Sequence, residues 1–72
     1  MYQTHEPTQA EVGQMWSDND PRATYQEFTI LEVLDSGFVR VKRGPRTTTI
    51  AIHRLLKSAH RRRGYTYLGM SK

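Results

Sequence analysis

Ionisable side chains are distributed very unevenly along this 72-residue chain. All seven acidic residues precede Gly37, whereas ten of the eleven lysines and arginines follow it, so residues 1–36 carry a formal charge of −6 and residues 37–72 carry +10. Cations with no acids between them repel one another unless an anionic surface lies nearby. The pattern predicts that the second half binds a polyanion, and it leaves open that the two halves partly neutralise each other after folding.

The cations of the second half form two groups, one on and beside a predicted strand and one around a basic loop. Arginine forks match phosphate oxygens in pairs, threonine hydroxyls add neutral hydrogen bonds, and an aromatic ring such as that of Phe38 can stack on a base. Nucleic acid, DNA or RNA, is therefore the expected partner, with an acidic protein surface and a merely solubilising face as alternatives. The candidate nucleic-acid-binding residues are Arg40, Lys42, Arg43, Arg46, Arg54, Lys57, Arg61, Arg62, Arg63 and Tyr65.

The residue types that support catalysis or metal binding show no productive spacing. Cysteine is absent, which excludes a thiolate zinc site, a cysteine nucleophile and a disulfide framework. His53 and His60 lie seven residues apart across a predicted helix–loop boundary, which is not a metal-ligand spacing, and His5 lies in a polar terminal segment. No glycine-rich phosphate-binding motif occurs. We therefore expect no catalytic residue, no metal, no cofactor and no enzyme activity.

Asp18 and Asp20 are the paired carboxylates that most resemble an acid–base site. They lie in a segment dense in turn formers, where short polar side chains bond to their own backbone and Pro21 fixes φ. We expect them to cap and shape this turn, with Arg22 as a partner, rather than to catalyse a reaction.

The length of the chain allows one domain, which we place at residues 11–69 between tails at 1–10 and 70–72. A chain of this size buries only about 60% of its unfolded surface, which leaves little material for an enclosed active site. No apolar run approaches the roughly 20 residues of a membrane span, and residues 1–7 lack the features of a signal peptide. A cytoplasmic protein without membrane contact is expected.

Short apolar runs between turn formers predict the elements that position the cations. Five strands are expected, together with one helical turn at 53–57, and the strand ranges are 12–16, 25–34, 38–43, 46–52 and 65–68. The second range also fits a helix with Phe28, Leu31 and Leu34 on one side. The strand is favoured because residues 35–37 then form a hairpin turn.

Period-two alternation assigns the side chains to faces of the third and fourth strands. Val39 and Val41 are expected to point inward, and Arg40 and Lys42 to point outward. In the fourth strand Thr48, Ile50 and Ile52 are expected inward, with Thr47, Thr49 and Ala51 outward. The third and fourth strands should pair, which would bring the two cations and the threonines of the outer set onto one face.

Large aromatic side chains allow two interpretations. Trp16, Tyr25 and Phe28 could form a groove for a peptide, but core filling is favoured because so small a domain needs its large side chains inside. Leu55 and Leu56 in the helical turn would plug one end of a barrel. The order of elements predicts an all-β fold, a small SH3-like five-stranded barrel with one short helical turn before the last strand. An OB-fold fits less well, because no helix signal separates the third and fourth strands.

Residues 13–22 have the pattern Gly-x-apolar-Trp-x-Asp-x-Asp-Pro-Arg. The pattern, followed by Thr47-Thr48-Thr49-Ile50 and Arg63-Gly64-Tyr65, resembles a group of small actinobacterial and actinophage proteins over residues 12–68. The resemblance implies a source and a fold rather than an activity. For a phage protein in a host cytoplasm, a module that binds and modulates a host factor is the alternative function.

Overall fold

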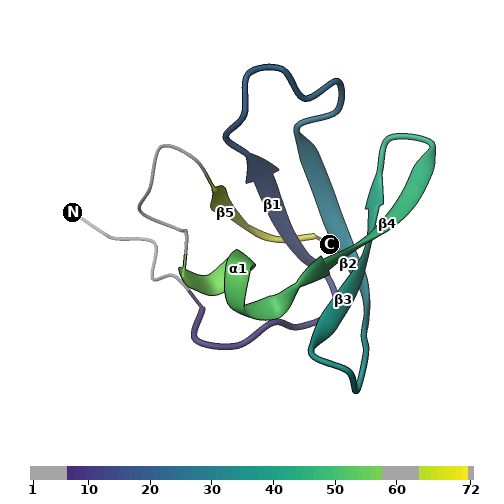
Figure 1. Ribbon diagram of the computed structural model, residues 1–72, viewed down its shortest axis with the longest axis vertical. Helices are drawn as coiled ribbons and strands as arrows, with labels where there is room; N and C mark the ends of the chain where they lie inside the picture. Colours follow the sequence, from purple (N-terminus) through teal and green to yellow (C-terminus); the bar gives the residue numbers. More distant parts are fainter. Residues whose placement is uncertain (1–6, 58–63, 72) are drawn as a thin grey trace.

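The computed structural model describes residues 7–57 and 64–71, and in this part of the chain the apolar runs form five strands and one helix. The strands pair antiparallel in one sheet with the order β4-β3-β2-β1-β5, as Figure 1 shows. The mostly β fold and the helix before the last strand confirm the coarse prediction, and the helical alternative for residues 25–34 is wrong. The elements are β1 (Gln14–Asp18), β2 (Glu27–Val33), β3 (Phe38–Arg43), β4 (Arg46–Ala51), α1 (Ile52–Lys57) and β5 (Tyr65–Met70).

One face of the sheet carries the core, because every second side chain of a strand points to the same side. Val39 and Val41 are fully buried, as the alternation predicted, and Ile50 of β4 is buried beside them. Thr48 also has the inward parity, but it is exposed. The buried apolar core consists of Trp16, Phe28, Ile30, Val39, Val41, Ile50 and Leu55.

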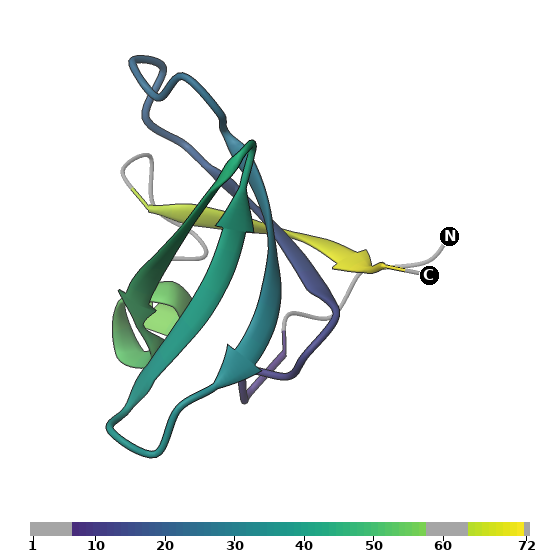
Figure 2. The ribbon, with the colours of Figure 1, turned by 90° about the vertical axis from the view of Figure 1, so that its right-hand side faces the viewer.

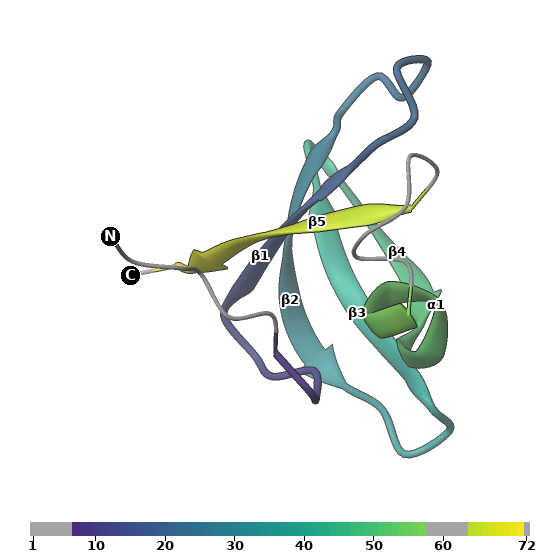
Figure 3. The same ribbon diagram turned by 90° about the vertical axis from the view of Figure 1, so that its left-hand side faces the viewer.

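Helix α1 follows β4 without a connecting loop and lies on the concave side of the curled sheet (Figures 2 and 3). Leu55 is fully buried and Leu56 packs against the core, so the two leucines cover the core as expected, but on an open sheet rather than at the end of a barrel. The backbone N–H of Ile52 donates to the carbonyl oxygen of Gly37 at 3.0 Å, which ties the start of α1 to the β2–β3 turn.

Two register shifts curl the sheet, one in the β1–β5 pair between Met15 and Trp16 and one in the β2–β3 pair between Ile30 and Glu32. Figures 2 and 3 show β5 crossing β2 and β3 steeply as a result. Within the described residues, however, no ladder joins β4 to β5, so the predicted closure into a barrel is not formed. The chain leaves β4 directly into α1, and buried Leu55 covers the core on that side instead.

Residues just outside both ends of the predicted domain, in the segments expected to be tails, bond to the sheet. Buried Gln14 accepts a hydrogen bond from Trp16 Nε1 at 3.3 Å and donates from Nε2 to the carbonyl oxygen of Gln9 at 3.0 Å. The backbone N–H of Ser71 donates to the carbonyl oxygen of Gly13 at 2.6 Å. No helix of the described chain is long and apolar enough to cross a membrane.

Candidate nucleic-acid interface

The cations of β3 and the threonines of β4 lie together on the outside of the sheet. In the β3–β4 register Arg40 is opposite Thr49 and Lys42 is opposite Thr47, and all four side chains are exposed. This confirms the predicted pairing and the predicted shared face. Together with Phe38, at the start of β3, these four residues define the β3–β4 outer face.

Arg40 forms an ion pair on this face with Glu32, which is its register partner on β2. The Arg40 and Glu32 side chains are 48% and 51% exposed. An ion pair this open to solvent contributes little to stability, and salt weakens it further. The contact uses Nη2, one nitrogen of a guanidinium that has five N–H donors, so a phosphate can still approach Arg40.

Lys42 borders a shallow hollow of about 440 Å³ on the outer side of the sheet. Met15 and Leu31 give the hollow an apolar surface, and Glu27 adds a carboxylate. Within the described residues the Lys42 ammonium forms no ion pair, so its charge is available to a ligand. The full lining consists of Met15, Glu27, Phe28, Thr29, Leu31, Lys42 and Gly44.

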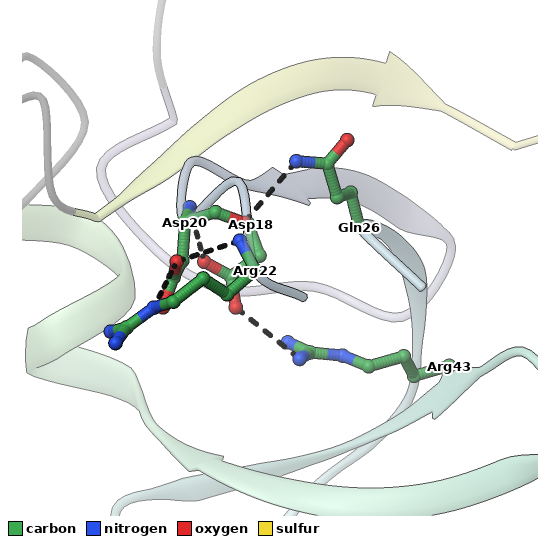
Figure 4. A network of polar contacts seen from close by, with 5 residues as sticks. All are labelled: Asp18, Asp20, Arg22, Gln26 and Arg43. Atoms are coloured by element: carbon green, nitrogen blue, oxygen red, sulfur yellow. Dashed lines mark hydrogen bonds and ion pairs between the residues drawn. The ribbon is translucent and has the colours of Figure 1, made fainter. Parts of the chain in front are cut away.

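Arg43, the next residue of β3, continues the alternation of buried Val39 and Val41 and so lies on the opposite face. Figure 4 shows its side chain directed at Asp18. Its Nη1 is 3.3 Å from Asp18 Oδ2, the two side chains are only 23% and 18% exposed, and its guanidinium carbon lies 5.0 Å from the centre of the Phe28 ring. The Arg43 Nε is buried with no hydrogen-bond partner among the described atoms. These contacts engage Arg43 in joining β3 to β1, and we do not include it in the outer face.

The turn after β1 is built by its own carboxylates, as predicted. The backbone N–H of Asp20 donates to Asp18 Oδ1 at 3.0 Å, and that of Arg22 donates to Asp20 Oδ1 at 2.9 Å (Figure 4). The Arg22 side chain also pairs with Asp20 at 3.2 Å, and this hydrogen bond, with the carboxylate charge, raises the pKa of Arg22 above its ordinary value. Gln26 Nε2 closes the turn by donating to the Asp20 carbonyl oxygen at 3.2 Å.

The other predicted site residues do not gather on the β3–β4 outer face. Arg46 is exposed, but it is the register partner of Arg43 and so has the opposite parity from Thr47. Arg54 is exposed on α1, which Lys57 ends. Arg61, Arg62 and Arg63 lie outside the described residues.

Tyr65, the predicted stacking residue of β5, is half-buried against Phe28, with ring centres 5.6 Å apart and planes at 84°. Trp16 and Phe28 are core residues, which confirms core filling over a peptide groove at these two positions. Tyr25 is 47% exposed, and its ring lies against Gly44, where an added Cβ would come within 2.6 Å of it. Gly44 also has a φ of 58°, so this turn position requires glycine.

The acidic and apolar parts of this surface were not predicted from the sequence. Glu32 reaches Arg40 because the register shift exposes both Leu31 and Glu32, and no local sequence signal marks such a shift. The inward direction of Arg43, in contrast, was predictable, because Arg43 continues the alternation set by Val39 and Val41.

Among residues 7–57 and 64–71, no three histidine, aspartate or glutamate side chains come together as a metal-binding group. Comparisons of the chain with protein-family models, with curated proteins and with solved structures find no match. The resemblance to actinobacterial and actinophage proteins therefore stays a prediction.

Proposed function

We propose that this protein is a small non-catalytic binding module whose β3–β4 outer face binds nucleic acid. The observation that carries the proposal is the register that sets Arg40 and Lys42 opposite Thr49 and Thr47 on one exposed surface. Cationic and hydroxyl donors in adjacent rows match the charged oxygens of a phosphate backbone, which supplies most of the affinity in sequence-independent binding.

Partial neutralisation within the molecule does not remove this charge. Asp18 pairs with Arg43 on the inner face, and Glu32 pairs with Arg40 in an open contact that a phosphate can replace. Acidic residues are absent from residues 37–72, so no carboxylate side chain of this half offsets the charges of Arg40 and Lys42.

The fold behind this surface is, in our proposal, an opened SH3-like sheet. The strand order β4-β3-β2-β1-β5 and the single short helix before β5 support this assignment, and the missing β4–β5 ladder is the departure from a closed barrel.

A protein-binding module directed at an acidic host factor is the second candidate. The hollow beside Lys42, with Met15 and Leu31, favours it, because exposed apolar surface is typical of protein interfaces. It ranks second because Trp16, which an aromatic peptide groove would need, is fully buried.

Salt-dependent binding of labelled oligonucleotides, measured by fluorescence anisotropy, tests the first candidate. Arg40→Gln with Lys42→Gln should weaken binding to all sequences and flatten the slope of log affinity against log salt by up to about 2, because each phosphate contact on duplex DNA contributes about 0.9. Arg22→Gln, compared with each of the two substitutions made singly, is the control for the loss of one charge, since Arg22 is exposed but lies in the turn after β1. Wild-type protein without salt-sensitive affinity for any DNA or RNA would give first place to the protein-binding candidate.

A further inference from the structure

The β3–β4 outer face carries an exposed aromatic ring beside its cations. Phe38 is 41% exposed, although it begins a strand whose alternate residues Val39 and Val41 are fully buried. Its register partner on β4 is Ala51, whose small side chain covers little of the ring. An exposed phenyl ring beside cations provides the stacking surface that unpaired bases use.

Phe38, Arg40 and Lys42 form a straight row, because alternate residues of a strand share a face and lie about 6.6 Å apart. A ring, two cations and then the hollow beside Lys42 therefore follow one another along β3. An extended nucleotide chain alternates phosphates and bases at a comparable repeat, so its phosphates can reach the cations while bases lie at both ends of the row.

The composition of the hollow favours a base over a phosphate. Met15 and Leu31 offer apolar contact, and the Glu27 carboxylate repels a phosphate but accepts a hydrogen bond from an exocyclic amino group. Lys42, at the border of the hollow, is placed to meet the adjoining phosphate.

The geometry points to single-stranded nucleic acid, DNA or RNA, as the ligand of the β3–β4 outer face, with one base stacked on Phe38 and another in the hollow beside Lys42. This inference rests on the proposed function and narrows its ligand class. In a duplex the bases are paired and stacked inside, so they reach neither the ring nor the hollow, and only the phosphates remain to be contacted.

Anisotropy titrations with a mixed-sequence oligonucleotide, as single-stranded DNA, single-stranded RNA and duplex DNA, test the inference on the full chain. We expect at least one single strand to bind more tightly than the duplex. Phe38→Ala should weaken single-strand binding about 5- to 150-fold, the range for losing one stacked base, and should leave duplex binding unchanged. Val12→Ala is the control, since Val12 is exposed and precedes β1.

Phe38→Trp gives a direct optical readout of stacking. Trp16 is the sole tryptophan of the chain and is fully buried, so ligand should change its fluorescence little. The indole introduced at position 38 should be quenched by a single strand and not by a duplex, with affinity retained, which a purely structural role for Phe38 would not produce.

Four results overturn the inference. The single-strand assignment is refuted if duplex and single strand bind with equal affinity, or if Phe38→Ala weakens single-strand binding no more than Val12→Ala does. Either result leaves the proposed nucleic-acid function standing. Polyglutamate that binds as tightly as the oligonucleotides identifies the face as one for acidic protein. Absence of binding to all three nucleic acids refutes the proposed function as well.

Discussion

Both faces of β3 carry apolar and cationic side chains, but these side chains serve the fold on the inner face and are open to solvent on the outer face. On the inner face Val39 and Val41 are fully buried and Arg43 is held by Asp18 and the Phe28 ring. On the outer face the alternate residues of the same strand are exposed. The charge of a segment therefore does not reveal which cations can meet a ligand, because the alternation of side chains along the strand decides which cation is engaged within the fold.

The two ion pairs of β3 differ in the same way. Asp18–Arg43 is about one-fifth exposed and joins β3 to β1, whereas Glu32–Arg40 is about half exposed and joins neighbouring strands that already pair. Desolvated charges depend strongly on their partners, while exposed ones depend on them weakly. The first pair should therefore affect stability, and the second should affect ligand binding.

The largest effect is expected from the core below the inner face. Trp16→Ala should lower the free energy of unfolding by about 3–5 kcal/mol, because it removes the largest fully buried side chain, and this loss is comparable with the total stability of so small a domain. Phe38→Ala on the outer face should cost less than about 1 kcal/mol. Urea unfolding followed by circular dichroism measures both, and similar losses would show that the two faces are not distinct.

A smaller effect is expected from the inner ion pair. Arg43→Gln should lower the free energy of unfolding by about 1–3 kcal/mol, because it leaves the Asp18 carboxylate partly buried without its cation and uncovers the Phe28 ring. Arg40→Gln, which makes the same change on the outer face, should cost less than about 1 kcal/mol. A double-mutant cycle with Asp18→Asn isolates the pair, and zero coupling between residues 18 and 43 would contradict this assignment.

Local patterns predicted the elements and most of the faces. The third strand has the bounds that alternation gave, and Val39, Val41 and Ile50 are buried as expected. Alternation works here because each strand buries one side only, so that hydrophobicity and direction are linked. The helical turn was also predicted, from Leu55 and Leu56, although its predicted start at residue 53 is one residue after the observed start of α1 at Ile52.

What the sequence did not predict depends on contacts between distant residues. Asp18 and Arg43 are 25 positions apart, and the pairing of Glu32 with Arg40 depends on a register shift in β2. The edge between β4 and β5 is likewise unpaired where α1 follows β4 and covers the core, and the pattern of a single strand does not predict this packing. The grouping of Arg40 and Lys42 with the threonines was predictable because it needs only parity and a hairpin.

The smallest and most discriminating effect is expected from Glu32. Glu32→Gln removes the carboxylate that competes with phosphate for Arg40, so binding to nucleic acid should strengthen and the salt slope should steepen by up to about 1. The free energy of unfolding should change by less than about 1 kcal/mol, because the pair is open to solvent.

Glu11→Gln is the control, because it makes the same change in net charge outside the sheet, on an exposed residue. If net charge acts at a distance, the two variants should show the same gain in affinity in anisotropy titrations. A gain in affinity confined to Glu32→Gln means that Arg40 itself contacts the ligand. Equal gains would therefore remove Arg40 from the β3–β4 outer face as a binding residue and leave Lys42 as its remaining cation.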